Sequence, residues 1–285
     1  MLNPQSIRKV HLVVSPGFYP NYLLTAICEQ AGVTIESLSI AGGRDYNTES
    51  LKEAHQSLAG LRCLSREQVG VASSAYPDLS AVATHLIQRA GFPKRCIYAC
   101  EGATYLSETL QCQQSIALVR RIRADKDNPL VLAFTDAIFR GEWLAEDITI
   151  LNAHPGIVPY AMGIGAIEQI AVSEDIERFR KGAGCTIHIV TSKLDKGPIV
   201  ATKGITNPFG YSSLAGLRAH NFLDMFSLMA SCALNLRGGP DARRRATPSE
   251  TDGYEVYLRK DRTNDLRSRA ENAYQKMCLA VTGHF

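Results

Sequence analysis

The sequence lacks a long apolar run, a strong net charge and an internal repeat. No stretch approaches the roughly 20 consecutive apolar residues that a membrane-spanning helix needs, and the N-terminal region has no signal-peptide pattern. The formal net charge is only +3, which is too small to predict binding to nucleic acid or to a charged membrane surface. We therefore expect a cytoplasmic protein with neither nucleic-acid nor membrane partners.

The eight cysteines show no ligand-like pattern either. They are scattered through the chain, no two form a C-x-x-C pair, and Cys96 and Cys100 are not followed by a second pair at zinc-ligand spacing. Cysteines distributed in this way are typical of reduced, mostly buried thiols. The sequence therefore predicts no bound metal.

What the sequence does contain is an alternation of strand-like and helix-like segments. Its 285 residues, 45% of them apolar and 21% charged, suit one globular domain with or without an appendage. Residues 10–15 and 34–40 resemble strands, and residues 21–30 between them carry apolar side chains at helical spacing. This β-α-β order implies parallel strands joined by a right-handed crossover.

The alternation continues along the chain. Further strands are predicted at 95–100, 130–134, 148–152, 185–190, 198–203 and 254–258. Further helices are predicted at 50–58, 81–90, 105–123, within 160–173, and at 213–236 and 264–280. This pattern predicts the α/β class, with a Rossmann-like, mostly parallel sheet and helices on both faces. We expect a catalytic domain at 1–240 and a small C-terminal extension at 241–285.

Three polar residues lie beside these strands. Asn152 and His154 occur in the segment Leu151–Val158, and Asp195 lies in the turn Leu194–Gly197. Alternate residues of a strand project to the same face, so the first two are expected to point together. Taken singly, such residues are usually caps, satisfied core residues or turn formers. An amide, an imidazole and a carboxylate brought together would suit chemistry on a carbonyl group.

Two motifs resemble the signature of the folate-dependent formyltransferases. Residues 152–159, NAHPGIVP, are similar to that family's N-x-H-P-S-L-L-P motif. Residues 184–190, GCTIHIV, followed by 194–199, LDKGPI, resemble its G-x-T-x-H-x-V…D-x-G-x-I signature. Both motifs occur in the family's order. The resemblance implies an enzyme that transfers the formyl group of 10-formyltetrahydrofolate to an amine.

The resemblance also assigns roles to the polar residues. Formyl transfer passes through a tetrahedral intermediate whose negative oxygen must be stabilised by hydrogen-bond donors. The resemblance implies that Asn152 and His154 are those donors, and that Asp195 holds a water for the associated proton transfers. His188, in the downstream motif, is expected to orient the Asp195 turn, with a direct role left open.

The family resemblance further implies where the folate co-substrate would bind. In the family the pterin lies between the N-x-H strand and the loop after the preceding strand, where backbone groups bind it. Here that loop is 135–139, and the loop 190–194 would close the other side. The residues predicted to bind the co-substrate are Thr135, Asp136, Ala137, Ile138, Phe139, Val190 and Leu194. For Ile138 and Phe139, plain core packing is an equal alternative.

The acceptor amine is less determined. Family members that act on glycinamide ribonucleotide hold its phosphate on a Gly-rich loop after the first strand, through backbone amides. The corresponding loop here is 15–21, SPGFYPN, whose two prolines remove donors. We therefore expect another small amine, bound through Ser15, Phe18, Tyr19 and Asn21. N5-hydroxyornithine, an acceptor in siderophore biosynthesis, is slightly favoured, and a nucleotide-linked amino sugar is the alternative.

Two functions of other kinds stay open. The same three residues could release formate from 10-formyltetrahydrofolate by hydrolysis, or the chain could bind folate without catalysis. A tRNA substrate is not expected, because the C-terminal part is short and mostly helical. We expect a monomer or a homodimer, and the sequence predicts no role for residues 46–128.

Overall fold

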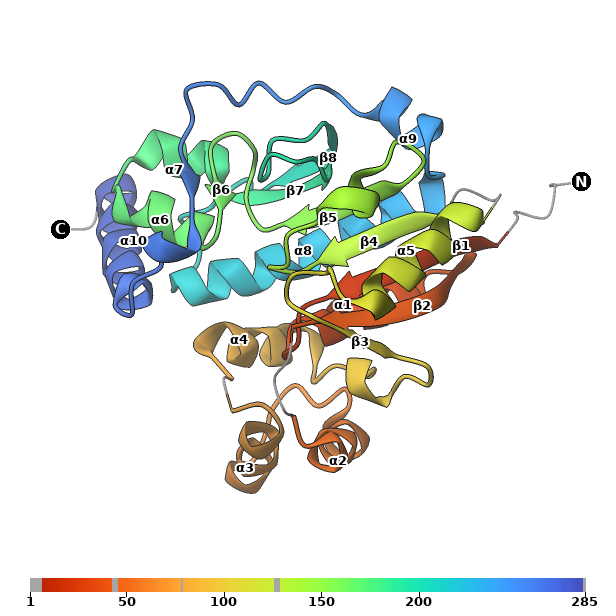
Figure 1. Cartoon of the computed structure of the whole chain (residues 1–285). Coiled ribbons are helices and arrows are strands. Elements are labelled where there is room, and N and C mark those ends of the chain that lie inside the picture. The colour runs from red at the N-terminus through yellow and green to blue at the C-terminus, as the bar shows by residue number, and fades with distance from the viewer. Residues whose placement is uncertain (1–6, 43–45, 78, 126–128, 284–285) are drawn as a thin grey trace, which may run out of the picture.

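A seven-stranded sheet forms the centre of the molecule, as Figure 1 shows. The computed structural model describes residues 7–42, 46–77, 79–125 and 129–283, so the outermost residues of both predicted domains lie outside it. The strand order is β3-β2-β1-β4-β5-β7-β8. The strands are β1 (Arg8–Val14), β2 (Val33–Ala41), β3 (Thr104–Leu106), β4 (Leu130–Phe134), β5 (Thr149–His154), β7 (Gly184–Ile189) and β8 (Ile199–Gly204).

The sheet is mostly parallel. Strands β1 to β5 pair in parallel, whereas β7 pairs antiparallel with both β5 and β8. Strand β4 is a continuous apolar run, and the last five residues of β1 are buried, as expected for strands that are covered on both faces. The predicted Rossmann-like class is confirmed.

Alternating side chains divide the core into two layers. Leu12 of β1 packs in the layer that contains α1 (Pro20–Glu29) and α8 (Leu214–Asn235). Its neighbour Val13 faces the opposite layer, which contains α5 (Gln113–Ala124). Successive side chains of a strand point to opposite faces, so one apolar run serves both layers. Helices therefore cover both faces of the sheet, as predicted.

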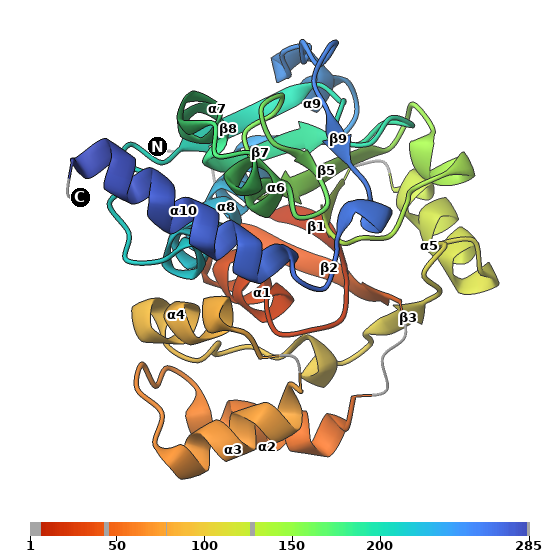
Figure 2. The same ribbon diagram turned by 90° about the vertical axis from the view of Figure 1, so that its left-hand side faces the viewer.

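Between β2 and β3 the described residues form three α-helices and one short 3-10 helix. The α-helices are α2 (Thr48–Leu58), α3 (Arg66–Ala75) and α4 (Ala81–Ala90). Figures 1 and 2 show α2 and α3 farthest from the sheet, with α4 between them and the rest of the molecule. Helix α4 has its predicted bounds. Helix α3 was not predicted, although Ser65 and Gln68 form a capping box at its start.

The prediction of a strand at 95–100 is wrong. Residues Ile97–Ala99 form a short 3-10 helix, η1, and Ile97 and Tyr98 are buried. The Ile97 N–H donates to the side-chain oxygen of Asn21 at 2.8 Å. Because this side chain from α1 satisfies the backbone donor, the segment does not need a strand partner there.

The prediction of a helix over 105–123 is correct only from Gln113 onward. Tyr105 lies in β3 and pairs in parallel register with Ile40 of β2. Pairing at the edge of the sheet overrides the local helical pattern, since strand formation depends on the neighbour available.

The C-terminal part packs back onto the rest of the chain. Strand β9 (Val256–Tyr257) pairs in parallel with β6 (Met162–Gly163), and α10 (Leu266–Thr282) packs on α6 (Ala166–Val172) in a separate apolar cluster. The remaining helical segments are η2 (Gly141–Leu144), α7 (Ile176–Gly182), α9 (Pro240–Arg245) and η3 (Arg259–Asp261). Within the described ranges, no helix combines the length and apolarity needed to cross a membrane.

Candidate active site

Strand β5 carries two of the three predicted catalytic residues. Asn152 and His154 are two residues apart, and the antiparallel neighbour β7 places His188 opposite Asn152. The Asn152 Nδ2 atom lies 3.2 Å from His188 Nε2. Both histidines are buried, and Asn152 is half-buried. The spacing in β5 and the register with β7 thus bring one amide and two imidazoles together.

Asp195 joins these residues from the loop between β7 and β8. Its Oδ2 lies 3.4 Å from His154 Nδ1, and its Oδ1 lies 3.3 Å from His188 Nε2. Only 5% of Asp195 is exposed, so the carboxylate is out of bulk water. The structure therefore brings Asn152, His154, Asp195 and His188 into one cluster, although their catalytic roles stay predictions.

Backbone groups complete this cluster. The Gly163 N–H donates to Asp195 Oδ2 at 2.8 Å, and His154 Nε2 donates to the Ala161 carbonyl at 2.8 Å. Both residues lie in the segment after the N-x-H motif. Sequence reasoning missed them because their contribution comes from the backbone, although the glycines at 163 and 165 signal an unusual local path.

The His188 ring faces both hydrogen-bond acceptors and a hydrogen-bond donor. Its Nδ1 lies 3.2 Å from the Ile189 carbonyl, to which it can only donate. Its Nε2 lies beside both the acceptor Oδ1 of Asp195 and the donor Nδ2 of Asn152. A proton on Nε2 therefore favours the contact with Asp195, whereas a bare Nε2 accepts from Asn152.

The environment keeps Asp195 ionised. Burial acts to raise its pKa, but the nearby imidazole of His154, the hydrogen bond and charge of His188 and the Gly163 N–H together outweigh burial and lower the pKa below its ordinary value. A buried carboxylate that remains charged near neutral pH can hold a cationic imidazole or orient a water molecule.

The predicted folate loop follows β4 and is mostly accessible. Asp136 and Ile138 are exposed, and 56% of Ile138 faces solvent. The Ser15 hydroxyl lies 3.0 Å from the Thr135 hydroxyl and accepts from the Asp136 N–H, so this loop is tied to the loop after β1. Phe139 is buried against Trp143, which leaves its backbone as the part that can contact a ligand.

The solvent exposure of the second predicted folate segment, 190–194, varies along its length. The Val190 N–H donates to the Ile150 carbonyl, and its side chain is half-buried. Leu194 is 45% exposed. Exposed aliphatic side chains such as Leu194 and Ile138 are suited to cover an apolar ring.

The loop after β1 is more buried than predicted. Phe18 and Asn21 are buried, and Asn21 Nδ2 donates to the Phe18 carbonyl and to the Tyr76 hydroxyl. Every polar atom of the Asn21 side chain has a protein partner, since Oδ1 accepts from Ile97. The predicted contact of these two side chains with the acceptor does not agree with this burial.

In the same loop Tyr19 is half-buried and Gly17 is buried. The Tyr19 ring stacks on Phe222 with centroids 4.9 Å apart, and its hydroxyl lies 2.6 Å from the Ser80 hydroxyl. The Gly17 N–H donates to the Tyr98 hydroxyl at 2.8 Å. Sequence reasoning missed Tyr98, because it lies 81 positions from Gly17 in the sequence.

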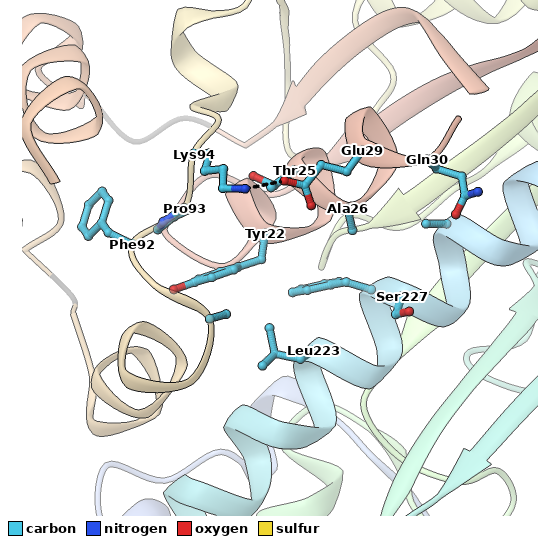
Figure 3. A pocket seen from close by; sticks show the side chains of 13 residues that line it. Tyr22, Thr25, Ala26, Glu29, Gln30, Phe92, Pro93, Lys94, Leu223 and Ser227 are labelled. Carbon is cyan, nitrogen blue, oxygen red and sulfur yellow. Dashed lines mark hydrogen bonds and ion pairs between the residues drawn. The ribbon is translucent and has the colours of Figure 1, made fainter. Parts of the chain in front are cut away.

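A cavity of about 350 Å³ lies elsewhere, between α1, α8 and the turn at residues 90–94 (Figure 3). Tyr22, Leu223 and Phe226 form its apolar wall, and an ion pair between Glu29 and Lys94 spans its edge at 2.8 Å. None of the clustered catalytic candidates lines it. Its residues therefore belong to a different surface of the molecule.

The fold and the cluster agree with the class of protein that the two sequence motifs predict. A mostly parallel α/β sheet that presents an Asn, a His and an Asp at one site is the arrangement expected of a formyltransferase. A model of the formyl transferase family matches residues 81–207, which contain all of the clustered side chains. This match supports the resemblance to the formyltransferases, and the prediction of a formyltransferase enzyme is confirmed.

Similar solved structures have low sequence identity. A candidate sugar N-formyltransferase of Mycobacterium tuberculosis shares 15% identity over 93% of this chain and 86% of that chain, with a TM-score of 0.50. A glycinamide ribonucleotide transformylase of Symbiobacterium toebii shares 18% identity over 82% and 88%, with a TM-score of 0.47. At an identity this low, the similarity to the Mycobacterium tuberculosis structure supports the fold alone. No curated protein matched the sequence.

Proposed function

We propose that the protein transfers the formyl group of 10-formyltetrahydrofolate to an amine or hydroxylamine nitrogen of a small metabolite. The observation that carries this proposal is the buried Asp195 carboxylate, which lies between His154 and His188 inside the family-matched segment. A carboxylate placed beside two imidazoles and an amide is suited to proton transfer next to a carbonyl. A cytoplasmic location and a monomeric or homodimeric state stay predictions.

In the proposed reaction the acceptor nitrogen attacks the formyl carbon. The carbonyl oxygen then becomes negative, and the Asn152 amide and the His154 imidazole would donate hydrogen bonds to it. For this the His154 Nε2 proton must leave the Ala161 carbonyl, to which it donates in the structure. The acceptor nitrogen loses a proton and the leaving folate nitrogen gains one, so no net proton is released. Asp195 would orient the water that carries this proton, with His188 holding the other carboxylate oxygen.

The folate would lie beside the loop 135–139 after β4 and the loop 190–194 after β7. Ile138 and Leu194 supply exposed aliphatic surface for the pterin, and the backbone of the first loop supplies polar contacts. Because the Phe139 side chain is in the core, we assign it a backbone contact only.

We propose that the acceptor binds beside Tyr19 and Ser15, and that it has no phosphate group bound by the loop after β1. The Gly17 N–H already donates to Tyr98, so this loop has lost a donor that an anion would need. This favours N5-hydroxyornithine over a phosphorylated amine. A nucleotide-linked amino sugar is the competing acceptor, because sugar N-formyltransferases occur among the similar structures.

An acceptor screen tests the proposal. The purified protein is mixed with 10-formyltetrahydrofolate and single amines, and the release of tetrahydrofolate is followed by absorbance. We expect release that requires one acceptor and falls by roughly 100-fold or more in His154→Ala. The matched control is His220→Ala, because His220 also lies beside an aspartate, Asp224, at 3.4 Å but on the surface. Release without any acceptor would indicate a hydrolase, and no release would contradict the proposal.

A further inference from the structure

The C-terminal segment contacts both parts of the chain that hold Asp195. One part is the loop that contains Asp195 itself. The other is β6, whose Gly163 N–H donates to the Asp195 carboxylate. These two parts are about 30 residues apart in sequence, between positions 163 and 195. A segment that fixes both of them also fixes the carboxylate between them.

The first contact is with the residues that follow Asp195. Thr247 and Ile199 exchange two backbone hydrogen bonds of 2.7 Å each. The Ser249 hydroxyl donates to the carbonyl of Lys196, the residue next to Asp195, at 3.0 Å. Residues 247–249 therefore hold the loop on the side where it enters β8.

The second contact is with β6. The Ile164 N–H donates to the Tyr257 carbonyl at 2.8 Å, and β9 lies in register beside Met162 and Gly163. The Tyr257 ring is buried and lies beneath the guanidinium of Arg178 at 5.8 Å. Strand β9 therefore sets the position of the Gly163 N–H that bonds to Asp195.

Asp195 needs this support because its backbone is unfavourable. Its φ angle is +49°, in the left-handed region that non-glycine residues rarely occupy. Such a conformation persists where the surroundings hold it in place. The same residue must also keep one oxygen beside each imidazole, where small displacements change reaction rates strongly.

We propose that residues 247–257 are a positioning clamp for Asp195, which sets the distance between its carboxylate and His154. This inference rests on the proposed role of Asp195 in formyl transfer. Ser249 is a positioning residue that can be tested directly, because its side chain makes the contact with the Asp195 loop.

The test compares four proteins, namely the wild type, Ser249→Ala, Ser249→Thr and Ser268→Ala. Ser249→Ala removes the hydroxyl, and Ser249→Thr keeps one. Ser268 is the matched control, because its hydroxyl also donates to a backbone carbonyl at 3.0 Å, that of Asp265, in the same extension. We expect kcat to fall roughly fivefold in Ser249→Ala with KM unchanged, and the other two variants to match the wild type.

A second measurement does not depend on activity. The ring ¹⁵N resonances of His154 and His188 report the position of the carboxylate between them, so we expect them to move in Ser249→Ala and not in Ser268→Ala. Unmoved resonances, an equal fall of kcat in Ser268→Ala, or a failure of Ser249→Thr to restore kcat would each overturn the clamp. Moved resonances in a protein that transfers no formyl group would support the clamp and contradict the proposed function.

Discussion

At the scale of single residues, two buried histidines outside the site affect stability in acid. His55 in α2 bonds through Nδ1 to the Pro93 carbonyl and through Nε2 to the Tyr76 hydroxyl. His11 in β1 bonds through Nδ1 to Ser37. Burial lowers the pKa of each histidine to about 4, against the ordinary 6.5. Both residues are therefore neutral in the folded protein near neutral pH.

These lowered pKa values predict that the protein loses stability in mild acid. Below about pH 6.5 the unfolded chain binds protons on both histidines, whereas the folded chain does not until about pH 4. The free energy of unfolding should therefore fall across this range, by up to about 3 kcal/mol for each histidine. Urea unfolding at a series of pH values measures the slope.

The variant His55→Gln should show a shallower pH slope than the wild type. The control is Leu279→Ala, because Leu279 is exposed on α10 and its side chain does not titrate, so the slope should be unchanged. Equal slopes in all three proteins would show that His55 is protonated in the folded state as easily as in the unfolded chain.

The clustered side chains could be predicted from the sequence because their residue types and spacing carry the signal. Asn152 and His154 alternate along a strand, and Asp195 and His188 belong to a second motif. The backbone groups of Ala161 and Gly163 could not be predicted in the same way, because any residue type offers a carbonyl or an N–H. Only the folded path shows which backbone group reaches the site.

At the scale of elements, the loop after β1 is held closed by the chain between β2 and β3. The Asn21 side chain bonds to Tyr76, and Tyr76 bonds to His55 of α2. Gly17 bonds to Tyr98 of η1. The helices between β2 and β3 thus have a structural role that the sequence did not predict.

This closure predicts a cost for Tyr98→Phe. The variant removes the hydroxyl that accepts from the buried Gly17 N–H, and a buried donor left without a partner costs about 1–3 kcal/mol. Urea unfolding should show that loss. Tyr105→Phe is the control, because Tyr105 is 56% exposed in β3 and should change stability little. Equal stability of the two variants would mean that the Gly17 bond contributes nothing.

The sequence predicted most strands but not every boundary. Apolar runs such as Leu130–Phe134 become strands because a parallel sheet buries both of their faces. The segment 95–100 was also predicted to be a strand, yet it forms η1, because the Asn21 side chain accepts a hydrogen bond from the Ile97 N–H. Local composition does not record which distant side chain will supply a hydrogen bond.

At the scale of the whole molecule, the C-terminal helix α10 shares a core with the rest of the chain. Tyr274 is fully buried, and its hydroxyl donates to the carbonyls of Pro208 and Tyr211. Its ring packs beside Phe179 and Phe209. The extension predicted at 241–285 is thus joined to the catalytic part by packing as well as by the chain.

This shared core predicts that Tyr274→Ala destabilises the whole protein. Removing a large buried ring costs about 3–5 kcal/mol. We expect one cooperative unfolding transition, shifted to lower urea and monitored by circular dichroism and by the fluorescence of Trp143. Leu279→Ala, at an exposed position of the same helix, is the control. Two separate transitions would instead indicate that the extension unfolds independently.

The contact between Gly163 and β9 has an evolutionary consequence. A Cβ atom at position 163 would collide with the backbone of Tyr257, and the φ angle of Gly163 is +88°. Because the obstacle is main chain, no substitution at position 257 can make room for a larger residue. Related proteins that place another amino acid at this position must have moved or lost the C-terminal strand. The residue type at position 163 therefore indicates whether a strand equivalent to β9 still pairs beside the site.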